Sequence, residues 1–132
     1  MRHYAWGVLS IFALIAQSGE AWTGYVNSYK DWRALSDYGR QMYAMALFDS
    51  FSLVGFEPSA AAMAVGVEAC GGALRPTGEM LEQAISAHYA QHPDKWDRTP
   101  MLIFYDAFVR GACLSYINDE RKQKGLAPWL KP

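Results

Sequence analysis

Residues that usually signal a reaction centre are scarce in this chain. Its 132 residues include two cysteines and three histidines, and the formal net charge is −1. Without a basic excess, a nucleic-acid partner has no electrostatic support. The sequence contains no Gly-x-Ser-x-Gly elbow and no phosphate-loop spacing of glycines. We therefore expect a protein that is not an enzyme and that holds no cofactor and no metal ion.

Long apolar runs are also missing, and a short one lies near the N-terminus. Gly7–Ala16 contains about ten mostly apolar residues, too few to span a bilayer. Arg2 supplies a positive charge before it, and small residues up to Ala21 suit a cleavage site. Residues 1–21 are therefore predicted to be a secretory signal peptide, with cleavage after Ser18 as an alternative. A short core helix of a cytosolic protein is the other interpretation.

The remaining residues, 22–132, are enough for one domain. Hydrophobic residues make up 52% of the chain and aromatic residues 14%, so a packed core is expected rather than disorder. We expect this domain to be exported and free of the membrane after signal cleavage. The sequence does not decide whether it forms a homodimer.

The hydrophobic periodicity predicts an all-α fold, a small bundle of about four to five helices, and no β-hairpin signal is present. The expected helices span about 25–35, 38–53, 60–69, 78–92 and 100–122, of which 60–69 is the weakest because Gly66 and two valines interrupt it. Thr23 or Gly24, Ser36, Thr77 and Thr99 are the expected N-terminal caps. Gly125 is the expected terminator of the last helix.

Two of these helices have distinctive faces. Tyr25, Tyr29 and Trp32 recur at i, i+4 and i+7, which indicates a core stripe or, alternatively, a partner-binding face. The 38–53 helix has almost no polar face, so we expect it at the centre of the bundle. Asp49 lies on that helix among apolar side chains and is expected to be buried. It would then anchor a helix N-terminus or an arginine, or act as an acid, base or ligand.

The two cysteines are expected to organise the domain. In an oxidising compartment an even pair favours a disulfide, here Cys70–Cys113, over a metal or redox site. Such a bond would clip two helix-bearing segments together, with Cys70-Gly71-Gly72 forming a turn. Two buried free thiols are the alternative.

The histidines that follow the signal, His88 and His92, are spaced i, i+4. On a continuous helix this spacing places both rings on one side, as in some zinc sites. Two ligands are too few for a zinc site, and Tyr89 stands where a zincin would have its glutamate. A histidine at a helix end more often caps carbonyls. In the last helix, Asp106 and Arg110 are expected to pair at i, i+4.

A pattern of segments resembles a known family. The sequence Tyr-Ala-Met-Ala-Leu-Phe-Asp ending at Asp49 is followed by Cys70, by the helix Leu81-Glu82-Gln83 to Tyr89, by His92-Pro93, and by Ala112-Cys113. This order is similar to the Rap/Tai immunity proteins of type VI secretion systems, over roughly residues 32–113. The family's signature glycine is replaced here by Ala46 or a neighbour, and an additional cysteine pair that members often carry near the first two helices is missing.

The resemblance implies a small disulfide-bonded helical domain in the periplasm that binds and blocks a secreted peptidoglycan amidase toxin. By resemblance, Asp49 corresponds to the signature aspartate, and Cys70 with Cys113 to a structural disulfide. We expect the contact surface in the 55–60 loop, with Phe56 and Glu57, and in the 94–99 linker, with Asp94, Trp96 and Asp97. For Trp96 the alternative is that it covers a helix end.

The sequence is also compatible with two other functions. One is a periplasmic chaperone for acid stress, in which protonation of carboxylates such as Asp49 exposes apolar surface. The other is an enzyme of unknown type.

Overall fold

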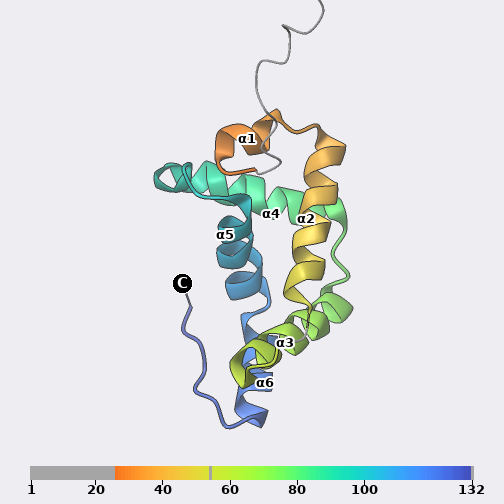
Figure 1. Ribbon diagram of the computed structural model, residues 1–132, viewed down its shortest axis with the longest axis vertical. Coiled ribbons are helices and arrows are strands. Elements are labelled where there is room, and N and C mark those ends of the chain that lie inside the picture. The colour runs from red at the N-terminus through yellow and green to blue at the C-terminus, as the bar shows by residue number, and fades with distance from the viewer. Residues whose placement is uncertain (1–25, 54, 132) are drawn as a thin grey trace, which may run out of the picture.

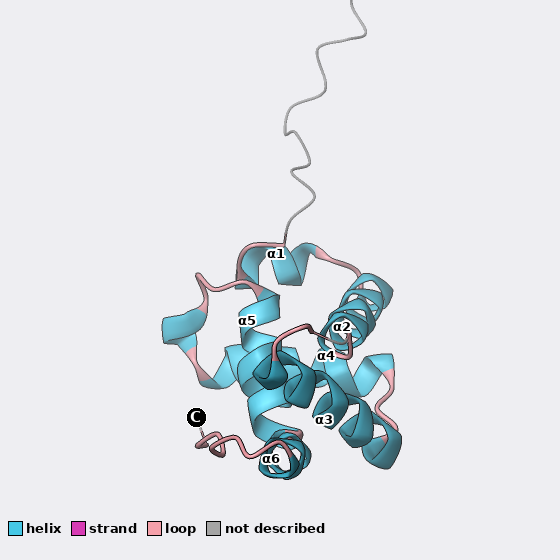
Figure 2. Ribbon diagram, turned by 60° about the horizontal axis from the view of Figure 1, so that its bottom comes forward, coloured by secondary structure: helices cyan, strands magenta, loops and turns pink. Residues whose placement is uncertain are grey.

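The computed structural model describes residues 26–53 and 55–131, and all regular structure within them is helical (Figures 1 and 2). The elements are α1 (Tyr29–Ala34), α2 (Asp37–Phe51), α3 (Pro58–Leu74), α4 (Gly78–Gln91), the 3₁₀ turn η1 (Pro93–Lys95), α5 (Pro100–Phe104), the π-helix η2 (Tyr105–Ala112) and α6 (Leu114–Gln123). The all-α prediction is confirmed. The predicted signal peptide, Tyr25 and the caps Thr23 and Gly24 lie outside the described residues.

Side-chain caps set the start of most of these helices. Ser36, Thr77 and Thr99 each accept a hydrogen bond from the backbone N–H three residues later, as their sequence positions predict. Ser28 caps α1 in the same way, so this helix begins later than the sequence suggested. Gly125 ends the α6 segment with a positive φ of 68°, which glycine adopts without steric cost.

The helices form two groups joined by two vertical segments, α2 and α5–η2 (Figure 1). α1, α4 and the start of α2 lie at one end, and α3 crosses α6 at the other. α5 and η2 connect the groups and supply the buried residues Ile103, Phe104, Phe108 and Val109. A polar chain ties the first group together: Trp32 donates to Ser86, Ser86 donates to Glu82, and Arg40 donates to Glu82 from α2.

α3 is longer than predicted. It runs from Pro58 to Leu74, so the expected turn at Cys70-Gly71-Gly72 is wrong and these residues are helical. The glycines allow close contacts between helices and do not form a turn. A Cβ on Gly66 would lie 2.5 Å from the Cα of Ile117 on α6, and one on Gly71 would meet the Phe48 ring. The glycines thus let α3 pack closely against α6 and α2. The segment is helical although its glycines lower its helix propensity.

The last predicted helix is interrupted by a π-helical stretch. Cys113 N–H donates to Phe108 O, five residues earlier, at 2.9 Å. The expected Asp106–Arg110 pair is therefore replaced. Asp106 accepts from Lys95 at 3.2 Å, and Arg110 donates to the carbonyl of Leu130 at 2.8 Å.

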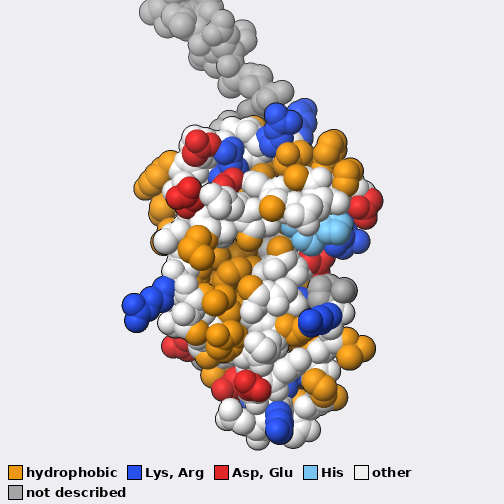
Figure 3. All heavy atoms as spheres, turned by 180° about the vertical axis from the view of Figure 1, so that it is seen from behind, with side chains coloured by type: hydrophobic (Ala, Val, Ile, Leu, Met, Phe, Trp, Pro, Cys, Tyr) orange, Lys and Arg blue, Asp and Glu red, His pale blue; other side chains and the backbone are white. Residues whose placement is uncertain are grey.

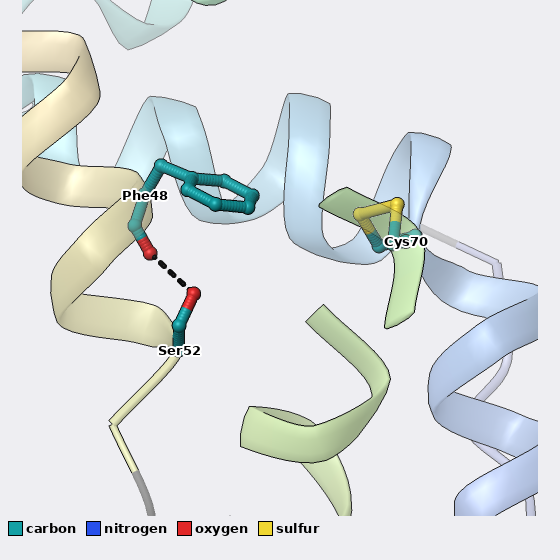
Figure 4. Close-up of a disulfide and its surroundings, with 4 residues drawn as sticks. Phe48, Ser52 and Cys70 are labelled. Atoms are coloured by element: carbon teal, nitrogen blue, oxygen red, sulfur yellow. Dashed lines mark hydrogen bonds between the residues drawn. A yellow bond between two sulfur atoms is a disulfide. The ribbon is translucent and has the colours of Figure 1, made fainter. Parts of the chain in front are cut away.

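A disulfide joins Cys70 on α3 to Cys113 at the junction of η2 and α6, with the Cα atoms 5.4 Å apart. Both residues are fully buried. The bond between their sulfur atoms confirms the predicted pairing over the alternative of two buried free thiols. Figure 4 shows the Phe48 ring directed toward this bond from α2, with the Ser52 hydroxyl donating to the Phe48 carbonyl. The disulfide therefore sits where α2, α3 and the last helical segment meet.

The C-terminal tail folds back along α6 and is held by Arg121. This side chain is 8% exposed. Its Nε donates to Ala127 O at 2.6 Å, its Nη1 donates to Ser59 Oγ at 2.7 Å, and its guanidinium lies 5.1 Å from the Trp129 ring centre. Asn118 completes the attachment with two hydrogen bonds to the Trp129 backbone. One guanidinium thus connects the tail, α6 and the start of α3.

We predict that Arg121→Met destabilises the fold by about 2–3 kcal/mol, because hydrogen bonds from a charged group are lost while the aliphatic packing is kept. Hydrogen exchange of residues 126–131 should accelerate more than exchange of α4. Lys122→Met, at an exposed neighbour on the same helix, is the control and should leave both readouts near wild type. Unchanged exchange in the tail of Arg121→Met would contradict this role.

Candidate partner-binding surface

An open pocket of about 410 Å³ lies between α1 and the turn after η1. It is lined by Tyr29, Lys30, Arg33 and Ala34 from α1, and by Trp96. We call this the α1–η1 pocket. It combines two aromatic rings with two cations, and Tyr, Trp and Arg are the residue types most enriched among binding hot spots.

Trp96 is held rigidly although it is 48% exposed. Its indole N–H donates to Tyr89 O, in the last turn of α4, at 2.9 Å, and its ring lies 5.1 Å from that of Tyr29. The carbonyl of Trp96 accepts from the backbone N–H of Tyr29 at 2.9 Å. Trp96 therefore does cover a helix end, as the alternative interpretation proposed, and it also presents an ordered face to solvent.

Beneath the pocket lies Tyr89, whose side chain is buried and uncharged. The Tyr89 ring lies 4.9 Å from the Tyr29 ring at a tilt of 33°, and its hydroxyl donates to Arg98 O at 2.6 Å. Burial, with smaller effects from Tyr43 and Asp31, raises the pKa of Tyr89 well above its ordinary value. The hydroxyl therefore stays protonated and keeps this support in place at any physiological pH.

The charges around the pocket have both signs. Lys30 and Arg33 are exposed on α1, with the Arg33 guanidinium 5.8 Å from the Tyr29 ring centre. Asp94 and Asp97 are exposed on the turn that carries Trp96. The α1 side of the pocket thus presents two cations beside aromatic rings. This arrangement suits an acidic group of a partner that is flanked by apolar surface.

The other predicted contact region lies elsewhere on the molecule. The α2–α3 connection, with Phe56 and Glu57, is at the lower end of α2, whereas η1 is at the upper end of the fold (Figure 1). Phe56 is fully exposed and Glu57 is exposed as well. The structure therefore separates the predicted contact residues into two groups rather than bringing them into one surface.

The predicted burial of Asp49 is wrong. The sequence predicted a buried carboxylate, but Asp49 is exposed. The reason is that α2 does not lie at the centre of the bundle. It buries Ala44 and Leu47 and turns Tyr38, Met42 and Met45 toward solvent, with exposed fractions of 72, 46 and 45%. Since Asp49 needs no buried partner, the proposed acid trigger based on its burial has no support.

The exposed apolar surface is broader than the sequence suggested. Figure 3 shows hydrophobic side chains gathered in a band down the middle of the face opposite that of Figure 1. Exposed large hydrophobic residues also occur on α4 and α5, at Met80, Met101 and Leu102. Such surfaces in small proteins commonly mark interaction sites.

The two histidines lie together at the end of α4, with ring centres 4.3 Å apart. Lys95 Nζ is 3.3 Å from His88 Nε2 and also donates to Asp106. Partial burial, then the positive charge of Lys95 and the neighbouring His92, lower the pKa of His88 below its usual value, so His88 is neutral at pH 7. Among the described residues, no three side chains of metal-ligand type gather in one place.

None of the described helices combines the length and the apolar character needed to cross a membrane.

The sequence analysis identified Trp96 as a contact residue but missed its neighbours Lys30 and Arg33. No local sequence signal shows that α1 packs against the turn after η1.

A comparison of the chain with protein-family models, curated proteins and solved structures finds no match.

Proposed function

We propose that this chain is an exported binding protein that inhibits a peptidoglycan-cleaving amidase toxin in the periplasm, in the manner of the Rap/Tai immunity proteins that its sequence resembles. The α1–η1 pocket is the observation that carries a binding role. It is concave, contains hot-spot residue types, and rests on the buried Tyr89.

Rigidity supports this proposal. An inhibitor that is ordered before it meets its target loses less conformational entropy on binding. The disulfide fixes α3 to the last helical segment, and the indole and backbone bonds of Trp96 fix the pocket wall. The pocket would receive an acidic protrusion of the partner, with Lys30 and Arg33 binding the carboxylate and Trp96 packing against its apolar flank.

The test uses the product of the neighbouring reading frame. If that product is a secreted amidase, the mature chain should bind it and suppress its hydrolysis of peptidoglycan. We predict that Trp96→Ala and Arg33→Glu each weaken binding by about 30-fold or more, since loss of a hot-spot residue costs about 2 kcal/mol. Titration calorimetry and a peptidoglycan hydrolysis assay measure the two effects.

Matched variants separate the possible results. Lys122→Glu makes the same kind of charge reversal at an exposed position of α6, at the other end of the molecule (Figure 1), and should keep full affinity. If Phe56→Ala abolishes binding while the pocket variants do not, the contact lies on the α2–α3 connection and the pocket assignment is wrong. If the folded wild-type chain neither binds nor inhibits the neighbouring amidase, or no amidase is encoded there, the proposed function is wrong.

A further inference from the structure

The side chain of Lys95 joins three segments of the fold. Lys95 belongs to the 3₁₀ turn η1, and its ammonium lies 3.3 Å from His88 Nε2 on α4 and 3.2 Å from Asp106 Oδ2 on η2. The side chains of Lys95 and Asp106 are 22% and 19% exposed, so neither charge is fully solvated. We call His88, Lys95 and Asp106 the Lys95 bridge. The bridge holds η1 against both α4 and η2.

The contact between Lys95 and His88 requires a neutral imidazole. An ammonium group has three N–H donors and no acceptor, so Nε2 of His88 accepts the hydrogen bond and the ring proton is on Nδ1. When the ring takes up a second proton, Nε2 becomes a donor as well. Two cations then face each other at 3.3 Å, so the hydrogen bond is lost and the like charges repel.

The other charged groups around His88 have both signs. They are His92 at the C-cap of α4, Asp94 on η1 and Asp106 on η2. Figure 3 shows the histidine side chains at the surface, beside side chains of both charges. Burial, then Lys95 and His92, outweigh the two carboxylates and lower the pKa of His88 below its ordinary value. The contribution of neutral His88 to stability is therefore present above the ordinary histidine pKa and is lost as the pH falls.

The residue that follows Lys95 forms a wall of the α1–η1 pocket. The indole N–H of Trp96 donates to Tyr89 O, and its carbonyl accepts from the Tyr29 N–H, both at 2.9 Å. The backbone N–H of Lys95 donates to His92 O, also at 2.9 Å. All three bonds require η1 to stay against the end of α4. A Lys95 side chain that leaves the bridge therefore loosens the turn on which Trp96 is carried.

We propose that the Lys95 bridge is a pH-sensitive switch, in which protonation of His88 detaches Lys95 from α4 and loosens the wall of the α1–η1 pocket. The wall is ordered at neutral pH and mobile in mild acid. The change is reversible, because deprotonation restores Nε2 as an acceptor. A loss of partner affinity in acid rests on the proposed function, whereas the switch itself is a property of the free chain.

NMR spectroscopy of the free, mature, disulfide-bonded chain between pH 7.5 and 4.5 tests the switch. The imidazole signals of His88 report its protonation, and the indole N–H signal of Trp96, assigned with Trp96→Phe, reports the turn. Both should change with one common midpoint below about 6.5, the ordinary histidine value. Hydrogen-exchange protection of the Tyr29 N–H should fall by about 10-fold across the same range, because a hydrogen bond from a charged donor is lost.

Three variants separate the causes. His88→Gln offers Lys95 a carbonyl acceptor at every pH, so the Trp96 signal should keep its neutral-pH position throughout. Lys95→Met keeps an aliphatic stem and should show at pH 7.5 the Trp96 signal that the wild type reaches in acid. His92→Gln changes the ring that does not bond to Lys95, and it should keep the transition with a higher midpoint because one neighbouring cation is removed.

The contrary results are equally specific. A Trp96 signal that does not follow the His88 midpoint would overturn the switch. The same transition in His88→Gln would assign it to carboxylates instead, and a wild-type neutral spectrum for Lys95→Met would show that the bridge does not hold the turn. These measurements need no partner. Failure of the switch therefore leaves the proposed inhibition standing, and a chain that inhibits no amidase leaves the switch standing.

Discussion

Removing the disulfide should lower the free energy of unfolding by about 4 kcal/mol. Cys70 and Cys113 are 43 residues apart in sequence, and closing a loop of that length restricts the unfolded chain by roughly this amount in the chain-entropy model. The bond also lies in the contact between α3 and the last helical segment, where both cysteines are fully buried. For a domain of this size, the loss is a large share of a typical stability of about 5–15 kcal/mol.

Chemical denaturation of the wild type and of Cys70→Ala/Cys113→Ala measures this difference. Alanine is preferred to serine at these positions because a buried hydroxyl would add its own cost. A reductant should destabilise the wild type and leave the double variant unchanged. Thiol titration of the unfolded, unreduced mature protein should detect no free sulfhydryl. Equal midpoints for the two proteins would contradict a stabilising role for the bond.

Local signals in the sequence were sufficient for the starts of α2, α4 and α5 and for the disulfide. Ser36, Thr77 and Thr99 cap the helices that their positions predict, and Gly125 ends the α6 segment with the expected positive φ. These features depend on a few neighbouring residues. The disulfide required one further inference, that an exported chain with two cysteines pairs them.

Features that depend on packing between distant segments were not predictable in the same way. Glycines at 66, 71 and 72 lower helix propensity, so the α3 segment was predicted to be short and followed by a turn. In the structure, contacts with Ile117 and Phe48 outweigh that penalty and the helix continues. The π-helical turn that ends at Cys113 is another case. No residue in 105–112 predicts the change of the backbone hydrogen bonds from i→i+4 to i→i+5.

The position of α2 shows a related limit of hydrophobic patterning. A helix with apolar residues on every side is expected to be buried on every side. α2 instead leaves Tyr38, Met42 and Met45 exposed, because one chain of this size does not supply enough elements to surround it. Asp49 was judged from those neighbours and was therefore misplaced. The candidate surface shows the same limit, since Trp96 was predicted as a contact but its cationic neighbours on α1 are distant in sequence.

The close crossing of α3 over α6 can be tested at a single residue, Gly66. Gly66→Ala should destabilise the domain by about 3 kcal/mol, at the upper end of the cost of overpacking a core. The added Cβ would lie 2.5 Å from Ile117 Cα and 2.8 Å from Ile117 N. These are backbone atoms, so no side-chain rotation can relieve the contact, and the two helices must separate. Thermal or urea unfolding measures the loss.

Two glycines on the same helix provide graded controls. Gly72→Ala meets nothing within 4 Å, so it should stabilise α3 by about 0.5–1 kcal/mol through helix propensity alone. Gly71→Ala meets the rim of the Phe48 ring, a side chain that can shift, so its effect should fall between the other two. The same substitution on one helix should therefore change sign according to what lies opposite. If Gly66→Ala were as stable as Gly72→Ala, α3 and α6 would not be in the close contact that positions Cys70 beside Cys113.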